Sequence, residues 1–133
     1  MIAYGCIAVL GLLIFAGGFH VSMCRARGNI VQGYPSDPSH FLHKAVRAHG
    51  NTVEYAPFAA LLIYVISQMH PPLWIIVSMI CLTLGRVSIF FGLILSSTLD
   101  KPQPLRFLGA LSTYIFGTIL CGYLLFIAMF KAV

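Results

Sequence analysis

The fold of this chain is decided by residues 45–69, which read AVRAHGNTVEYAPFAALLIYVISQM. The window meets the requirement of about 20 predominantly apolar residues for a helix that crosses the hydrocarbon core of a membrane. It also contains Arg47 and Glu54, which would then lie at membrane depth. Because each charged side chain near mid-bilayer costs about 2.5–3.5 kcal/mol on insertion scales, these residues indicate a polar site inside the membrane.

Three more apolar windows of similar length cover most of the remaining chain, at about 2–24, 73–96 and 107–130. Hydrophobic residues make up 59% of the 133 residues and charged residues only 8%, whereas about 25% are charged in soluble domains. The connecting segments are too short to form a soluble catalytic domain. We therefore predict an all-α integral membrane protein, a single domain over residues 1–133 that forms an up-down bundle of four transmembrane helices.

The basic residues of the loops predict how the bundle is oriented. Lys and Arg flank the first and third loops, whereas the turn at 70–72 contains neither. Because positively charged loops stay inside, we expect loops one and three to be cytoplasmic and both termini to lie on the opposite side. Lys131, near the C-terminus, argues against this orientation. The flanking residues are Arg25, Arg27, Lys44, Lys101 and Arg106.

Composition also bears on partners and metals. The formal net charge of +5 could suggest nucleic acid, but the basic residues form no cluster on a soluble face, so we expect no nucleic-acid partner. The four cysteines lack the paired spacing of a disulfide framework or a metal site. We therefore expect membrane lipids around the protein and no bound metal. The cysteines are Cys6, Cys24, Cys81 and Cys121.

Arg47, Asn51 and Glu54 share one stripe of the helix predicted at 45–69. At about 100° per residue, Asn51 lies about 40° from Arg47, and Glu54 returns to within about 20° of it. A cation, an amide and a carboxylate together suit a zwitterionic ligand. An internal ion network between helices is the alternative. His49 projects about 200° from Arg47, so it can serve the same pocket only if another subunit supplies a wall.

The pattern Arg-Ala-His-x-Asn-x-x-Glu-Tyr-x-Pro at 47–57, followed by Gly85-Arg86 and by Arg106-Phe-Leu-Gly109, resembles the MAPEG superfamily, the membrane-associated proteins in eicosanoid and glutathione metabolism. The chain is similar to microsomal glutathione transferases, and most of all to the short bacterial-type members. The resemblance implies a homotrimer that binds glutathione as co-substrate between neighbouring subunits. It also implies that His49 reaches the ligand of the neighbouring subunit.

The resemblance further assigns a role to each matching position. It implies that Arg106 lies beside the glutathione sulfur, where a guanidinium would stabilise the attacking thiolate. An anchor at the membrane interface is the alternative for Arg106, and the hydroxyls of residues 96–98 are alternative donors. For Arg86 we expect a structural ion pair, with Glu54 as a candidate partner. The implied glutathione-binding residues are Arg25, Arg47, His49, Asn51, Glu54 and Tyr55.

Ile89 and Leu93 depart from the family pattern, because several active members carry Tyr or His at these positions. The loss of two ligand contacts predicts weaker glutathione binding or a different thiol ligand. The leading hypothesis is a glutathione transferase or peroxidase whose thiolate attacks a lipophilic electrophile that arrives from the bilayer. A catalytically silent scaffold that binds lipid or another ligand is the first alternative. A small channel or transporter is the second, although it would require a continuous polar path.

Overall fold

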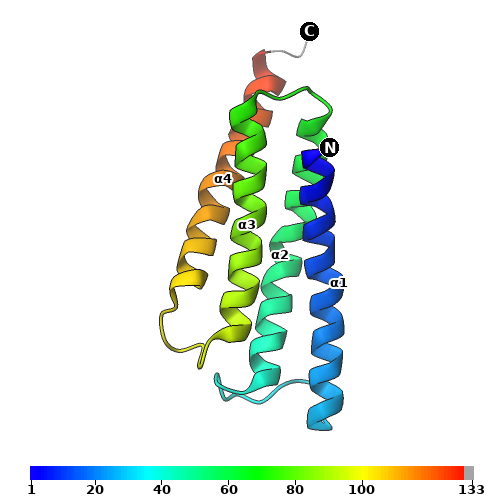
Figure 1. Cartoon of the computed structure of the whole chain (residues 1–133), viewed down its shortest axis with the longest axis vertical. Helices are drawn as coiled ribbons and strands as arrows, with labels where there is room; N and C mark the ends of the chain where they lie inside the picture. The colour runs from blue at the N-terminus through cyan, green and yellow to red at the C-terminus, as the bar shows by residue number, and fades with distance from the viewer. Residues whose placement is uncertain (131–133) are drawn as a thin grey trace.

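The computed structural model describes residues 1–130 and consists of four helices that alternate in direction (Figure 1). The two polar loops lie at one end of the bundle, which we call the loop end, and the short turn before α3 lies at the other, the far end. The predicted all-α bundle of four helices is thereby confirmed. The helices are α1 (Ile2–Gly28), α2 (Phe41–Ser67), α3 (Leu73–Leu95) and α4 (Pro104–Phe130).

Polar caps extend three of the helices beyond the windows that apolar composition predicts. α1 ends at Gly28 rather than 24, α2 begins at Phe41 rather than 45, and α4 begins at Pro104 rather than 107. Asn29 ends α1 in the left-handed conformation, with φ of 51°, and its N–H donates to the carbonyl of Ala26. At the start of α2, Nδ1 of His40 accepts from the N–H of Leu42 at 3.1 Å. Such caps satisfy helix-end groups that hydropathy does not register.

Three of the four helices, α1, α3 and α4, are long and apolar enough to cross a membrane. α2 is not among them, although it has 27 residues like α1. Its sequence includes Lys44, Arg47, Asn51 and Glu54, which lower its mean hydropathy. It nevertheless packs against both α1 and α3 and extends from the loop end to the far end as they do (Figure 1), so it crosses the membrane with them. Lys131, which bears on the predicted orientation, lies outside the described residues.

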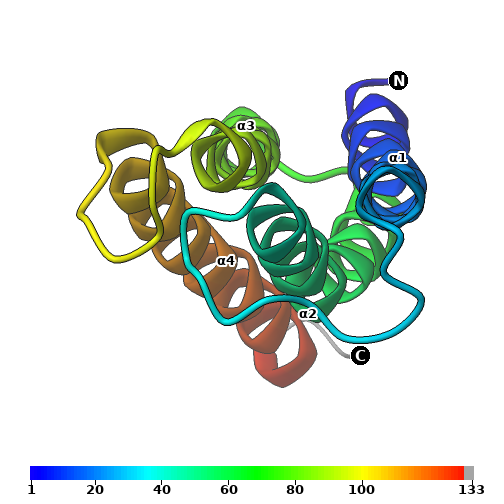
Figure 2. The ribbon, with the colours of Figure 1, turned by 90° about the horizontal axis from the view of Figure 1, so that it is seen from below.

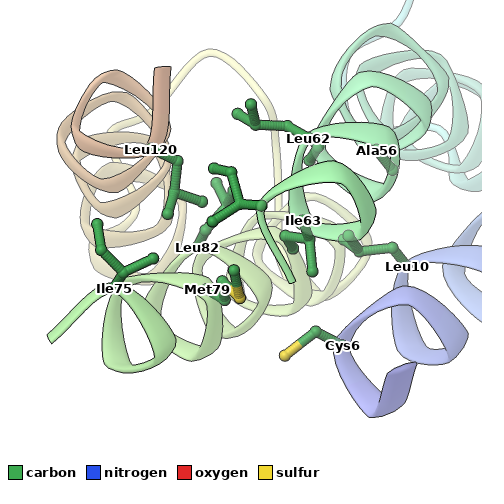
Figure 3. Packing of buried hydrophobic residues seen from close by; sticks show 11 residues of the cluster. Cys6, Leu10, Ala56, Leu62, Ile63, Ile75, Met79, Leu82 and Leu120 are labelled. Carbon is green, nitrogen blue, oxygen red and sulfur yellow. The ribbon is translucent and has the colours of Figure 1, made fainter. Parts of the chain in front are cut away.

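The far half of the bundle is filled by apolar side chains from all four helices (Figure 3). Leu10, Ile63 and Leu120 have no exposed surface, and Met79 is 1% exposed. In lipid, such packing stabilises the bundle through van der Waals contact rather than through removal from water. This half therefore has a structural role.

Two glycines bring α3 and α4 close together nearer the loop end. A Cβ atom on Gly109 would lie 2.7 Å from the carbonyl oxygen of Gly85 and 2.8 Å from the backbone nitrogen of Ile89. Oγ of Ser112 donates to the carbonyl of Cys81 at 2.8 Å, across the same contact. Small residues at such crossings let helix backbones approach each other. The contact fixes how Arg86 and the start of α4 lie relative to each other.

The first and third loops are joined at the loop end. The N–H of Leu99 donates to the carbonyl of Pro38 at 3.1 Å, and Nζ of Lys44 donates to the carbonyl of Ser96 at 2.9 Å. Within the first loop, the carboxylate of Asp37 accepts hydrogen bonds from the backbone N–H and the hydroxyl of Ser39. These contacts place the start of α2 next to the end of α3 and join the loops that precede α2 and α4.

Candidate functional site

A cavity of ≈ 380 Å³ lies between α2, α3 and α4 towards the loop end, and we call it the polar cavity. Three arginines line it, one from each helix: Arg47, Arg86 and Arg106. Within residues 1–130, no Asp or Glu lines it. Such a cavity favours anionic groups, because carboxylates and thiolates pair with guanidinium at short range. The remaining polar lining residues are Asn51, Tyr55, Gln103, Thr113 and Tyr114.

Arg86 is 1% exposed and contacts α2. Its Nη2 donates to both the carbonyl and Oδ1 of Asn51, at 2.8 and 2.7 Å. Its guanidinium carbon lies 4.8 Å from the centre of the Tyr55 ring. The contact commits Oδ1 of Asn51 to Arg86, which leaves the amide Nδ2 as the donor available to a ligand. Arg86 thus holds Asn51 and Tyr55 in place.

Arg86 was expected to form an ion pair with Glu54. In the described part of the chain its partners are instead a carbonyl, an amide oxygen and an aromatic ring. Glu54 is exposed and does not line the cavity. The ion pair therefore stays a prediction for an assembled protein.

Arg106 lies in the first turn of α4 and is held by the preceding loop. Its Nη1 donates to the carbonyls of Leu99 and Lys101, at 3.1 and 3.3 Å. Its backbone N–H donates to Oε1 of Gln103 at 2.7 Å, which caps the helix. A Cβ atom on Gly92 would lie 2.9 Å from the same backbone nitrogen, so the end of α3 packs directly on the start of α4. The start of α4, which is the positive end of its dipole, and the side chain of Arg106 thus both belong to the lining of the polar cavity.

The alternative hydroxyl donors in residues 96–98 do not line the polar cavity. Oγ of Ser96 donates to the carbonyl of Gly92, and Oγ1 of Thr98 accepts from the N–H of Asp100 at 3.4 Å. Both hydroxyls therefore stabilise the end of α3 and the loop that follows it.

The two departures from the family pattern, Ile89 and Leu93, both line the polar cavity from α3. They are 6% and 8% exposed. They give this wall an apolar surface where hydroxyl or imidazole groups would offer hydrogen bonds.

Three predicted binding residues lie outside the cavity of the single chain: Arg25, His49 and Glu54. Nη1 of Arg25 donates to the carbonyl of Val31 at 3.1 Å, beyond the end of α1. His49 packs against α1, where a Cβ atom on Gly17 would lie 3.2 Å from its Nδ1. This Nδ1 is buried and has no hydrogen-bond partner within residues 1–130. The placement agrees with the helical projection, which directs His49 away from Arg47.

Sequence reasoning missed Gln103 and Tyr114 as cavity residues. Gln103 precedes Pro104, and proline is favoured at the first position of a helix, so this pair was a signal for a cap at that point. The ring centre of Tyr114, in α4, lies 6.4 Å from that of Tyr55, and both residues line the cavity. Nothing in the local sequence marks this contact, because it depends on how α4 crosses α2.

A protein-family model, that of the MAPEG family, matches residues 3–126. A comparison of the chain with curated proteins finds no significant match, and neither does a comparison with solved structures. Members of the family are four-helix membrane bundles linked to glutathione or eicosanoid metabolism, and they are generally oligomeric. The match covers nearly the whole chain, and the four-helix fold agrees with it. The chain is therefore a membrane protein that belongs to the MAPEG family.

Proposed function

We propose that the protein is an integral-membrane glutathione transferase or peroxidase, which activates the glutathione thiol for attack on lipophilic electrophiles. The observation that carries this proposal is that Arg47, Arg86 and Arg106 line the same cavity. Within residues 1–130, no Asp or Glu is among its lining residues. Glutathione carries two carboxylates and one ammonium group at neutral pH, and its thiolate adds a further negative charge. A cationic cavity therefore stabilises glutathione with an ionised thiolate, which is the reactive form, relative to glutathione with a neutral thiol.

The residues of α2 suit the ground-state contacts of such a ligand. The guanidinium of Arg47 can bind a carboxylate with two parallel hydrogen bonds, and Nδ2 of Asn51 can donate to a peptide carbonyl. Glu54 lies on the same stripe as Arg47 but is exposed, so it would bind the ammonium group at the edge of the cavity. The tyrosine hydroxyl of Tyr55 would complete this set.

Arg106 is the residue to which we assign activation of the thiol. Only its Nη1 is bound to the loop carbonyls, which leaves Nη2 and Nε as donors to a sulfur atom. A free thiol has a pKa of about 8.5, and an adjacent guanidinium lowers it so that more thiolate is present at neutral pH. In conjugation, the sulfur forms a bond to the electrophilic carbon and the leaving group departs with the bonding electrons.

We further propose that the site is completed in a homotrimer. Arg47 and Glu54 are exposed in the single chain, although charge facing lipid at that depth is costly. A neighbouring copy would cover this stripe, and its Arg25 and His49 would supply the wall that the single chain lacks. The expected orientation puts the loop end and its opening on the cytoplasmic side. Native mass measurement that finds only monomers would contradict the shared site.

The apolar wall formed by Ile89 and Leu93 favours a second candidate function. A scaffold without catalytic activity could bind a lipid or another thiol there, because apolar contact would replace the missing hydrogen bonds. The channel alternative gains no support from the far half of the bundle, where side chains from all four helices pack into an apolar core.

The test uses purified protein in detergent, glutathione and a generic aryl halide. We expect thiolate absorbance when glutathione is added and conjugation when the halide follows. Arg106→Ala should leave glutathione binding within a few-fold, raise the apparent pKa of the bound thiol and lower turnover at neutral pH, with partial recovery at higher pH. Lys101→Ala is the matched control, because Lys101 is exposed on the same loop and does not line the cavity.

The outcomes separate the two candidates. Binding of glutathione without thiolate or turnover would identify a scaffold. An Arg106→Ala variant with full turnover and an unchanged thiol pKa would reduce Arg106 to an anchor at the membrane interface. Absence of any glutathione binding to the intact protein would overturn the proposed function.

A further inference from the structure

Gln103 lies where the third loop enters α4, and its side chain lines the polar cavity. Figure 2, which views the bundle from the loop end, shows this loop passing from the end of α3 to the start of α4. The carbonyl of Gln103 accepts from the N–H of Phe107 at 3.1 Å, and its Oε1 accepts from the N–H of Arg106 at 2.7 Å. Gln103 is therefore the N-cap residue of α4.

The cap determines which end of the Gln103 amide is free. A backbone N–H can only donate, so the atom that faces the nitrogen of Arg106 must be the amide oxygen. Nε2 then carries two donors, and within residues 1–130 the side chain's hydrogen bond is made by Oε1 and not by Nε2. Gln103 is half-buried, and Nε2 is not among the buried atoms that lack a partner. The two N–H groups are thus accessible to a bound molecule.

Gly92 of α3 makes room for this amide. A Cβ atom on Gly92 would lie 3.0 Å from Oε1 of Gln103, 2.9 Å from the backbone nitrogen of Arg106 and 3.0 Å from its Cγ. The amide and the stem of Arg106 therefore meet α3 at one point, closer than a side chain there would allow. Leu93, the next residue of α3, belongs to the apolar wall of the cavity. The third loop thus brings a hydrogen-bond donor to the edge of that wall.

A glutamine is not the residue that capping alone favours at this position. Asn, Asp, Ser and Thr are preferred at the N-cap because their short side chains reach the backbone N–H groups directly. An acidic residue would also place a negative charge in a cavity lined by three arginines. Gln103 combines a neutral acceptor for the cap with a donor on a longer side chain. This combination suits a residue that also contacts an anionic ligand.

We propose that Gln103 is a further catalytic residue, whose Nε2 donates a hydrogen bond to the sulfur of bound glutathione. The proposal rests on the proposed function and on the role assigned to Arg106, which lines the same cavity from the first turn of α4. When the thiol ionises, its proton passes to water and the sulfur keeps the electron pair. The guanidinium and the amide then both donate to the negative charge. Gln103 would supply a hydrogen bond that Ile89 and Leu93 cannot make.

Gln103→Ser and Gln32→Ser provide a matched pair of variants in the full-length protein. A serine at the N-cap accepts from the same backbone N–H, but its side chain is too short to carry a donor to the ligand. Gln103→Ser therefore removes the proposed contact and keeps the cap. Gln32 is exposed in the first loop and does not line the cavity. We expect both variants to keep the unfolding temperature of the unmodified protein in detergent.

The first measurement is the pKa of the bound thiol, obtained from thiolate absorbance as a function of pH. Gln103→Ser should raise this pKa by about one unit or more, because a hydrogen bond to a charged group is lost. Turnover at neutral pH should fall by about tenfold and recover at higher pH, where thiolate forms unaided. Gln32→Ser should match the unmodified protein in both respects.

The second measurement identifies the ligand atom that Gln103 contacts. Dissociation constants are determined above the thiol pKa for glutathione and for γ-glutamyl-alanyl-glycine, which lacks only the sulfur. Gln103→Ser should weaken the binding of glutathione by about tenfold or more and leave that of the alanine analogue within a few-fold. Equal weakening of both ligands would assign Gln103 to another group of the peptide and overturn the sulfur contact.

A third variant, Gln103→Leu, separates the donor from the cap. It removes both, so we expect the thiol pKa of Gln103→Ser together with a lower unfolding temperature. If Gln103→Leu were impaired while Gln103→Ser behaved like the unmodified protein, Gln103 would only cap α4, and the inference would be wrong while the transferase function stood. If the unmodified protein bound glutathione but formed no thiolate, the proposed function itself would fail, and the inference with it.

Discussion

The far half and the loop half of this bundle are built from the same four helices but pack in opposite ways. In the far half, Leu10, Ile63 and Met79 meet in an apolar core without polar partners among the described residues (Figure 3). In the loop half, α4 stands away from α2, and arginines face a cavity. The difference indicates that stability and chemistry are separated along the bundle axis. Changes in one half should then leave the property of the other largely intact.

The largest effect is expected from Met79→Ala in the far half. Met79 is 1% exposed, and truncation of such a side chain costs about 2–5 kcal/mol of folding free energy. Thermal unfolding in detergent measures the loss, while the glutathione dissociation constant should stay within a few-fold. Met129→Ala is the matched control because Met129 is 67% exposed. If Met79→Ala lost as much free energy of glutathione binding as of folding, stability and ligand binding would not be separated between the two halves.

The next effect concerns ligand binding in the loop half. Arg47→Ala and Glu54→Gln should each remove a charge-assisted contact worth about 1.5–3 kcal/mol, or about 10- to 150-fold in the glutathione dissociation constant. Calorimetry measures the constant, and the unfolding temperature should change little. Arg27→Ala is the control, because Arg27 is exposed at the end of α1 and lies outside the cavity. If both variants bound glutathione as tightly as the unmodified protein, Arg47 and Glu54 would not be ligand contacts.

A change at the contact of α3 with α4 tests where the two halves join. In Gly109→Ala the new Cβ would lie under 3.0 Å from the backbone of α3, so the helices must separate. Overpacking of this kind costs about 1–3 kcal/mol. We expect both stability and turnover to fall, because the shift also moves Arg106 relative to Arg86. Gly117→Ala is the control, because its new Cβ meets open space, and it should keep its stability and its turnover. If Gly109→Ala also kept both, the crossing of α3 and α4 would not position the site.

The smallest effect is expected in the first loop, outside the membrane. Hydrogen bonds from the backbone N–H and the hydroxyl of Ser39 lower the pKa of the Asp37 carboxyl below its ordinary value. A lowered pKa contributes stability that is present above the ordinary pKa of about 3.9 and is lost as pH falls through the folded-state value. Acid should thus loosen this turn at the loop end and leave the far half unchanged.

The measurement is a titration of Asp37 by nuclear magnetic resonance. Ser39→Ala should raise the pKa of Asp37 by removing the hydroxyl donor, while the backbone donor keeps part of the shift. Ser36→Ala is the control, because Ser36 is exposed in the same loop. An Asp37 pKa that does not respond to Ser39→Ala would assign the shift to the backbone contact alone.

The four helices, their passage through a membrane and the polar stripe of α2 could all be predicted from the sequence. Each depends on information within a single segment: apolar length, turn residues and a period of about 3.6 residues. The period placed Arg47, Asn51 and Glu54 on one stripe and His49 on another. Helix ends were predicted less well, because caps such as Asn29 and His40 act through single hydrogen bonds rather than through hydropathy.

Tertiary structure alone decided which side chains meet. Arg86 contacts Asn51 and Tyr55 rather than Glu54, and Tyr114 joins the cavity, because the rotation and crossing of α3 and α4 are set by contacts between distant residues. The approach of Gly85 to Gly109 fixes that crossing. Seen along the bundle, α4 then runs obliquely to the other helices (Figure 2), which leaves space for the polar cavity. A one-dimensional period describes the faces of a helix, but it does not contain the angle at which two helices pack.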